Sequence, residues 1–77
     1  MNSVQCKMAR AALGLGVREL AAAASVSVDT VSRLERGEEL LPRTVSAIRT
    51  ALESAGIVFL ADGEIATGGP GVRLRTD

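Results

Sequence analysis

Two short amphipathic patterns, separated by a break of three residues, constrain this chain more than any other feature. Helices joined so tightly must cross at a steep angle. The small alanines of the first pattern let another backbone approach closely. The apolar positions are Val17, Leu20, Ala21 and Ala24 in the first pattern, and Val26, Val31 and Leu34 complete the set beyond it.

The second helix of the pair has start and stop signals. The Ser27 hydroxyl can accept a hydrogen bond from a backbone amide near Thr30, and Gly37 can take the left-handed conformation that ends a helix. The outer face of this helix contains short and medium side chains that a core rarely selects, and a protruding helix of this kind suits the DNA major groove. These outer residues are Val28, Asp29, Ser32, Arg33 and Arg36.

Residues from 4 to 56 together resemble the helix-turn-helix of a known family. The matching residues are Arg10, Leu13-Gly14-Leu15, Leu20-Ala21, Val26-Ser27, Val31-Ser32, Leu34-Glu35 and Gly37. Their order and spacing resemble the phage-repressor or Xre-like family of bacterial transcriptional regulators. Two positions depart from the usual pattern: Ser25 stands in the turn where glycine is common, and Val17 stands where the family commonly has a glutamine that contacts phosphate. The resemblance implies binding to double-stranded DNA.

Further helices are expected on either side of this pair. The first begins after Ser3, and Arg10 borders its buried stripe, so that its guanidinium needs a carboxylate. Glu35 is the best partner, and the resemblance points to the same structural ion pair; two solvated surface charges are the alternative. Pro42 fits the first turn of a last helix, which Gly56 ends. The apolar stripes are Cys6, Ala9 and Leu13 in the first helix and Val45, Ile48, Leu52 and Ala55 in the last.

Residues 57–77 are predicted to form a short strand pair. Ile57–Leu60 is an apolar run of strand formers, Gly71–Arg75 alternates apolar and charged residues, and Asp62-Gly63 and Gly68-Gly-Pro-Gly71 between them are turn material. If Ile57 and Phe59 face the helices, the alternate side chains need a cover, which a second copy of the chain would provide. A tail that covers the core locally is the alternative. The expected dimerisation residues are Val58, Leu60, Val72 and Leu74, with Arg73 and Arg75 on the outer face.

The predicted fold class is therefore mainly all-α. Residues 1–56 form a four- to five-helix, repressor-like helix-turn-helix bundle, and residues 57–77 form a short C-terminal β-strand pair that serves dimerisation. A chain of 77 residues makes one small domain, and many of its apolar residues are alanines, so the core is thin and a dimer would support it.

Composition argues against several other classes of protein. Cys6 is the only cysteine and histidine is absent, so neither an internal disulfide nor a Cys/His zinc site is expected, and a reducing cytoplasm is the expected location. No apolar run approaches the roughly eighteen residues of a membrane span. Residues 68–71 lack the lysine of a phosphate-binding loop, and no set of catalytic groups is recognisable, so we expect no enzyme and no cofactor. Phe59 is the only aromatic residue, which argues against binding of single strands.

The net charge is zero, but the charges are unevenly distributed. Residues 1–49 contain seven basic and five acidic residues, whereas residues 50–77 contain two basic and four acidic residues. The basic excess lies with the helix pair and is small. We therefore expect DNA affinity to depend on dimerisation and on a modest number of phosphate contacts.

Specific roles on DNA can be assigned from position. The predicted base-contacting residues are Val28, Asp29, Ser32 and Arg33, because the first turns of a recognition helix reach base edges. Arg33 can bind guanine through two hydrogen bonds worth about 1–3 kcal/mol, Val28 can touch a thymine methyl, and Asp29 either accepts from cytosine or caps the helix. The predicted phosphate-contacting residues are Arg18, Ser27, Thr30, Arg36 and Arg43, for which a solvated charge or a cap is the alternative.

The favoured function is a dimeric repressor that binds a pseudo-palindromic operator with half-sites about 34–36 Å apart. The alternative is a protein-binding module, an antitoxin or anti-activator, that holds a toxin or activator through Val58, Leu60 and the glycine-rich tail. The two functions are compatible, since an antitoxin can also bind its own promoter.

Overall fold

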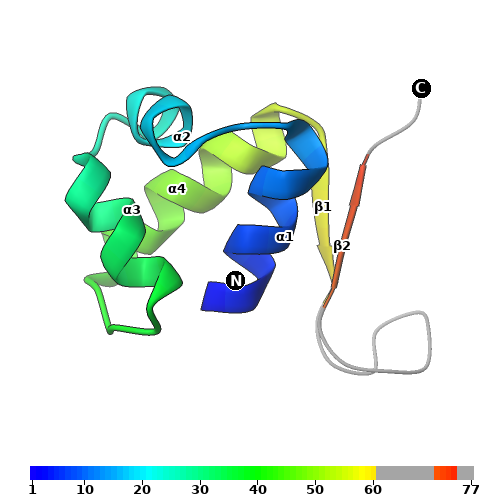
Figure 1. The fold of residues 1–77 in the computed structure, drawn as a ribbon. Coiled ribbons are helices and arrows are strands. Elements are labelled where there is room, and N and C mark those ends of the chain that lie inside the picture. The colour runs from blue at the N-terminus through cyan, green and yellow to red at the C-terminus, as the bar shows by residue number, and fades with distance from the viewer. Residues whose placement is uncertain (61–70, 75–77) are drawn as a thin grey trace.

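The fold is a bundle of four helices followed by two antiparallel strands (Figure 1). The computed structural model describes residues 1–60 and 71–74, with the backbone alone for Arg73 and Leu74. The mainly α-helical class expected from the sequence is confirmed, and the expected turns between the strands and Arg75 lie outside the described residues. The elements are α1 (Ser3–Leu13), α2 (Val17–Ala24), α3 (Val28–Glu35), α4 (Pro42–Ser54), β1 (Ile57–Leu60) and β2 (Gly71–Leu74).

Helix α1 begins one residue earlier than expected, because Asn2 caps it. The Asn2 side chain accepts a hydrogen bond from the Gln5 amide at 2.8 Å, and the Gln5 side chain accepts one from the Asn2 amide at 2.9 Å. Two amides that the helix leaves unpaired are thereby satisfied. The Gln5 side chain also donates to the carbonyls of Leu60 and Gly71, at 2.8 and 3.1 Å, and so fastens both strands to α1.

Left-handed residues end the first three helices and make the connections short. They are Gly14, Ser25 and Gly37, with φ of 68°, 57° and 90°. Among the described residues, Ser25 is the only residue other than glycine with a positive φ, a conformation that is strained for a side chain with a Cβ atom. The turn at Ser25 sets the steep crossing of α2 and α3 that the sequence predicts.

One hydrophobic core joins the helices and the strands. Ile57 and Phe59 of β1 are buried with it, as expected, and the strand pair therefore packs on the helical bundle. Ala55 is exposed because it follows the last residue of α4, and five other expected positions are only partly buried: Leu13, Val17, Ala24, Val26 and Val45. The buried apolar residues are Cys6, Ala9, Leu20, Ala21, Val31, Leu34, Ile48, Leu52, Ile57 and Phe59.

The register of the strands divides the residues that were expected to form a dimer contact. Val58 pairs with Arg73, and Phe59 pairs with Val72. Directly paired residues share a face of the sheet, so Val72 lies with Phe59 on the inner face and packs against the core. Val72 therefore lies on the opposite face of the strand pair from Val58, and its expected part in a dimer contact stays a prediction. Val58 remains 41% exposed and Leu60 is partly buried, while the side chain of Leu74 lies outside the described part of the chain.

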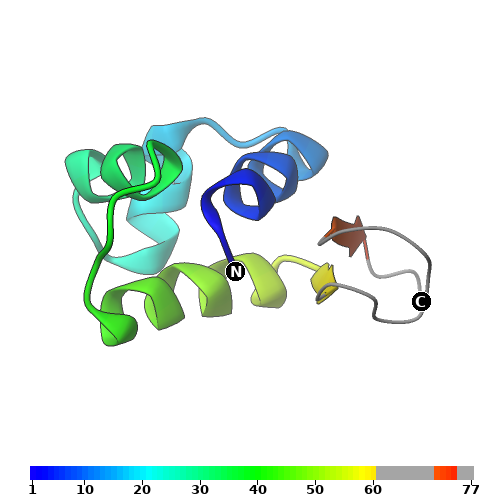
Figure 2. The ribbon, with the colours of Figure 1, turned by 90° about the horizontal axis from the view of Figure 1, so that it is seen from below.

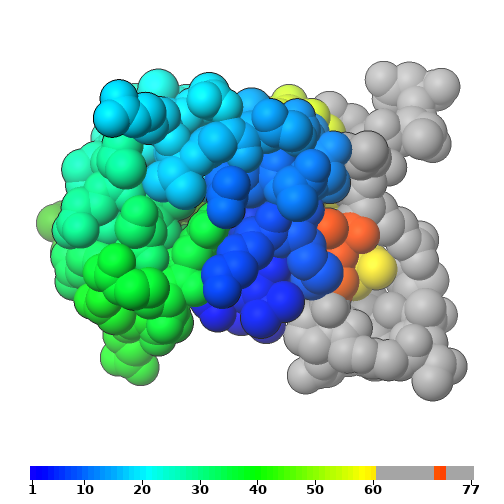
Figure 3. Space-filling view, in the orientation of Figure 1, coloured from blue at the N-terminus to red at the C-terminus, as the bar shows by residue number. Residues whose placement is uncertain are grey.

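Helix α3 and the strand pair lie at opposite ends of the molecule in two perpendicular views (Figures 1 and 2). Figure 3 shows α1 in the middle of one face, between α3 and the described strand residues. The longest dimension of the fold is 34 Å. Within the described residues, no helix has the length and apolar character needed to cross a bilayer.

Candidate nucleic-acid interface

Helix α3 has a buried face and an accessible face. Val31, Leu34 and Glu35 pack inward, which fixes the helix against α1 and α2. The four residues predicted to contact bases lie away from that buried face: Val28 and Asp29 are exposed, and Ser32 and Arg33 are partly exposed. The structure thus places all four on the accessible part of one short helix.

The N-terminus of α3 is capped by the pair of hydroxyl residues that the sequence singles out. The Ser27 hydroxyl accepts a hydrogen bond from the Thr30 amide at 3.0 Å, as predicted, and the two hydroxyls lie 2.7 Å apart within hydrogen-bonding distance. Ser27 performs the capping, and Asp29 in the first turn makes no side-chain hydrogen bond within the described residues. The Asp29 carboxylate therefore remains available to solvent or to a ligand.

The C-terminus of α3 ends in a motif that returns the chain toward the helix. Gly37 adopts the left-handed conformation predicted for it, and its amide donates to the Leu34 carbonyl at 3.0 Å. The Glu38 amide then donates to the Arg33 carbonyl at 3.1 Å, which completes the paired hydrogen bonds of a Schellman motif. Because of this motif, Glu38 lies beside the last turn of α3.

Glu38 forms ion pairs with both arginines of the outer face of α3. Arg33 donates from Nε to Glu38 Oε1 at 3.0 Å, and Arg36 donates from Nε and Nη2 to Glu38 Oε2 at 3.2 and 2.9 Å. Hydrogen bonds from Arg33 and Arg36 hold the pKa of the Glu38 carboxyl below its ordinary value. The sequence analysis missed Glu38, although its position directly after the glycine that ends α3 is a usable signal.

Beneath α3, Arg10 and Glu35 form the ion pair expected from the sequence. Arg10 donates from Nε and Nη2 to the two carboxylate oxygens of Glu35, both at 2.9 Å, and from Nη1 to the Leu15 carbonyl at 3.2 Å. The Cys6 thiol donates to Glu35 at 3.4 Å. Glu35 is only 9% exposed, so this network ties α1 to α3 in the interior and holds the accessible face of α3 in place.

Burial and hydrogen bonding act in opposite directions on Glu35. Burial raises the pKa of its carboxyl, but hydrogen bonds from Arg10 and Cys6 outweigh that effect, so the pKa lies below its ordinary value. For Cys6 the effects agree: burial, with the carboxylate of Glu35 beside it, raises the pKa of the thiol to about 12. The side chain of Cys6 is fully buried, so this thiol has a packing role.

The other residues predicted to contact phosphate lie near two helix N-termini of different character. At α2, where Arg18 is exposed, the Glu19 carboxylate already accepts a hydrogen bond from the Gly16 amide. At α4, where Arg43 is exposed, no side chain caps the helix. The first turn of α2 contains the acidic Glu19, whereas the first turn of α4 contains no acidic residue, so the start of α4 is the better phosphate site of the two.

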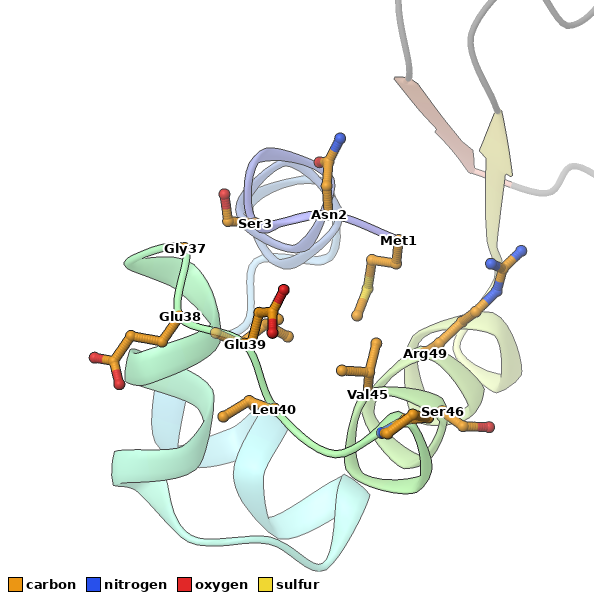
Figure 4. Close-up of a pocket in the computed structure, with 12 residues that line it drawn as sticks. Met1, Asn2, Ser3, Gly37, Glu38, Glu39, Leu40, Val45, Ser46 and Arg49 are labelled. Atoms are coloured by element: carbon orange, nitrogen blue, oxygen red, sulfur yellow. The ribbon is translucent and has the colours of Figure 1, made fainter.

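Two grooves flank the C-terminal part of α3. One lies between α3 and the start of α4, and its lining includes Thr30, Arg33 and Thr44. The other lies between the N-terminus, the end of α3 and α4, where Met1 and Val45 point toward each other and Leu40 adds to the lining (Figure 4). Glu38 stands at the edge of this second groove, and its carboxylate points away from it (Figure 4).

Comparison with known proteins supports the assignment of the helix pair. A family model described as a helix-turn-helix domain matches residues 4–56, which is more than half of the chain and covers α2, α3, α4 and all of α1 except Ser3. No curated protein matches the chain.

Proposed function

Because this chain belongs to the helix-turn-helix domain family, we propose that it is a sequence-specific, double-stranded DNA-binding transcriptional regulator of the phage-repressor or Xre-like type. The observation that carries the proposal is the accessible face of α3. Its polar residues protrude, while the buried Arg10–Glu35 pair and the core hold the helix rigidly from behind. A rigid helix with a polar outer face fits the major groove.

The direct contacts to bases come from the first two turns of α3. Arg33 binds guanine, Val28 contacts a thymine methyl, Asp29 accepts from cytosine, and Ser32 adds an adaptable hydroxyl. Val28 is 44% exposed, which is the accessibility that an apolar contact to a methyl group requires.

Phosphate contacts come from the groove between α3 and α4 and from the uncapped start of α4. Thr30 lines that groove, and its hydroxyl lies within hydrogen-bonding distance of the Ser27 hydroxyl. Each hydroxyl can rotate and donate to a DNA phosphate instead. Arg43 adds a positive charge at the start of α4, and the exposed Arg18 adds one at the start of α2 beside Glu19.

Two substitutions separate base recognition from phosphate contact. Arg33→Ala loses sequence preference, at a cost of about 1–3 kcal/mol on the preferred site alone. Arg43→Ala weakens binding to all sequences alike and reduces the slope of log K against log salt by about 1. The assay is a gel-shift titration at two salt concentrations, with DNA from upstream of the protein's own gene and with a shuffled duplex. Equal behaviour of the two variants on both duplexes refutes the assignment.

The regulator acts as a homodimer and represses by covering a promoter. Val58 on the outer face of β1 supplies an apolar contact for a second copy, with Leu60 beside it. A two-fold axis at the strands places the two α3 helices at the far ends of the dimer, because α3 and the strands lie at opposite ends of the protomer. The half-site spacing of about 34–36 Å expected from the sequence stays a prediction.

Light scattering tests the dimer directly. Val58→Asp places a charge in the proposed contact, so its mass falls to that of a monomer while its helical circular dichroism is kept. Val4→Asp, at an apolar position of α1 that is 56% exposed, serves as the matched control and leaves the mass unchanged. A wild-type monomer at high micromolar concentration refutes this part of the proposal.

A second candidate function is a protein-binding module, an antitoxin or anti-activator. The observation that favours it is again the 41% exposed Val58, since the surface that suits a second copy also suits a different protein. Light scattering and the gel-shift titration together separate the two: a monomer that binds no duplex DNA supports the protein-binding role.

A further inference from the structure

Glu38 lies where it can control which groups the side chains of Arg33 and Arg36 bind. It is the only carboxylate found within ion-pair distance of Arg33 and Arg36 among the described residues, and it contacts both at once. The Schellman motif at Gly37 fixes its backbone relative to the helix. An exposed ion pair contributes little to stability. This arrangement matters instead because it occupies the guanidinium groups of Arg33 and Arg36.

The two arginines are held in different ways. Arg33 uses only Nε for Glu38, and no hydrogen bond from its two terminal nitrogens is found within residues 1–60 and 71–74. The N–H groups on those two nitrogens can therefore donate to other acceptors. Guanine accepts two such hydrogen bonds, at O6 and N7. Arg36 donates to Glu38 from Nε and Nη2 together, which is the edge of the guanidinium that would otherwise take a phosphate.

We infer that Glu38 is a positioning residue for recognition, which orients Arg33 for a base and withholds Arg36 from the phosphate backbone. This inference rests on the proposed DNA-binding function. A carboxylate and a phosphate bind a guanidinium with the same geometry, so Glu38 competes with every phosphate regardless of sequence. The consequence is lower affinity for non-specific DNA and a higher ratio of specific to non-specific binding. Arg36, expected from sequence to contact phosphate, is on this inference held back from that contact.

The test compares Glu38→Gln with Glu39→Gln. Both variants remove one negative charge at adjacent exposed positions, but Glu39 forms no ion pair within the described residues. Binding to a random-sequence 24-base-pair duplex is measured across a salt series. Glu38→Gln is expected to steepen the slope of log K against log salt by about 0.9 to 1.8, for one or two phosphates gained, which is about eightfold in affinity per phosphate at 0.1 M salt. Glu39→Gln is expected to change the slope by less than half of that.

The specificity ratio is measured with a duplex selected by the wild-type protein from a random pool. It is expected to fall by about eightfold or more in Glu38→Gln, because non-specific affinity rises while the contact to guanine loses its orientation. Equal slopes and equal ratios for the two variants overturn the inference.

A measurement without DNA separates this inference from the proposed function. The heteronuclear NOE of the arginine Nε–H groups is expected to be high for Arg33 and Arg36 in the wild type, to fall in Glu38→Gln, and to stay high in Glu39→Gln. An unchanged NOE in Glu38→Gln overturns the inference that Glu38 holds the two arginines in place. Failure of the wild type to bind either duplex overturns the proposed function and the role of Glu38 on DNA, whereas the NOE still decides whether Glu38 holds the two arginines.

Discussion

Replacing Arg10 with methionine removes the partner of a buried carboxylate while keeping much of the side-chain volume. Glu35 then loses two hydrogen bonds of 2.9 Å and keeps only the weak one from the Cys6 thiol. Breaking one side of a fully buried ion pair costs about 3–5 kcal/mol. Because the Arg10 side chain is 26% exposed and water can reach part of the site, we expect about 2–4 kcal/mol.

The stability lost in Arg10→Met is a large share of the free energy of unfolding. A domain of 77 residues is expected to have a free energy of unfolding of roughly 4–12 kcal/mol. A loss near 3 kcal/mol lowers the melting temperature by about 12–24 °C in a domain of this size. Urea unfolding, followed by helical circular dichroism, measures the free energy, and thermal unfolding measures the shift.

Two controls identify the cause. Glu53→Gln breaks the exposed pair between Arg49 and Glu53 and is expected to cost at most about 0.5 kcal/mol. The double variant Arg10→Met/Glu35→Leu removes both charges and is expected to recover most of the loss, because no unpaired carboxylate stays buried. The reasoning is refuted if Arg10→Met costs no more than Glu53→Gln, or if the double variant is less stable than Arg10→Met alone.

Two further predictions concern acid and the strained turn. The pKa of Glu35 is lowered in the folded protein, so its contribution to stability is present above the ordinary carboxyl pKa of 4.5 and is lost as the pH falls through the folded pKa. The midpoint of urea unfolding should therefore stay level at neutral pH and fall below about pH 4.5. The fall should be less steep in Glu35→Gln. At Ser25, glycine relieves a left-handed conformation that costs about 1–2 kcal/mol and gives back about 0.4–1 kcal/mol through a more flexible unfolded chain. The net gain is centred near about 0.8 kcal/mol, so Ser25→Gly should raise the melting temperature by about 3–6 °C, and a lower melting temperature contradicts the strain argument.

Features that depend on neighbouring residues could be predicted from the sequence. The cap of Ser27 on the Thr30 amide and the left-handed Gly37 each involve residues within a turn of the chain, so residue type and spacing suffice. The start of α1 was missed by one residue, because Asn2 and Ser3 are both good capping residues. Gln5, three positions after Asn2, forms the capping box and was the signal that decides between them.

The sequence did not predict in the same way which side chains of β2 face the core. A slip of one residue in register reverses every side chain of a strand, and the sequence between β1 and β2 does not fix the register. In the structure Val72 pairs with Phe59 and packs inward, whereas the sequence analysis grouped it with Val58 in one expected dimer contact. The buried side of β1 was predictable because Ile57 and Phe59 directly follow a helix whose apolar face is evident.

The pairing of charges was predictable only where burial demanded it. Arg10 borders an apolar stripe, so a carboxylate partner was required and Glu35 could be named. Arg33, Arg36 and Glu38 are all exposed or partly exposed, and exposed charges have no required partner. Only the backbone path through Gly37 brings Glu38 to the two arginines, and that path is a property of the folded turn.

The net charge of the protein is zero, so its affinity for DNA would depend on which basic residues are already paired with a carboxylate. Of the seven basic residues in positions 1–49, four have a carboxylate partner in the described part of the chain. Lys7, Arg18 and Arg43 have none there, so few cations remain for phosphate contacts that ignore sequence. A regulator competes against an excess of non-specific sites, and its useful quantity is the specificity ratio rather than the affinity alone. On the proposed function, the internal pairing of four of the six arginines in residues 1–49 lowers the affinity for non-specific DNA, and the contact of Arg33 with a base then determines where the protein binds.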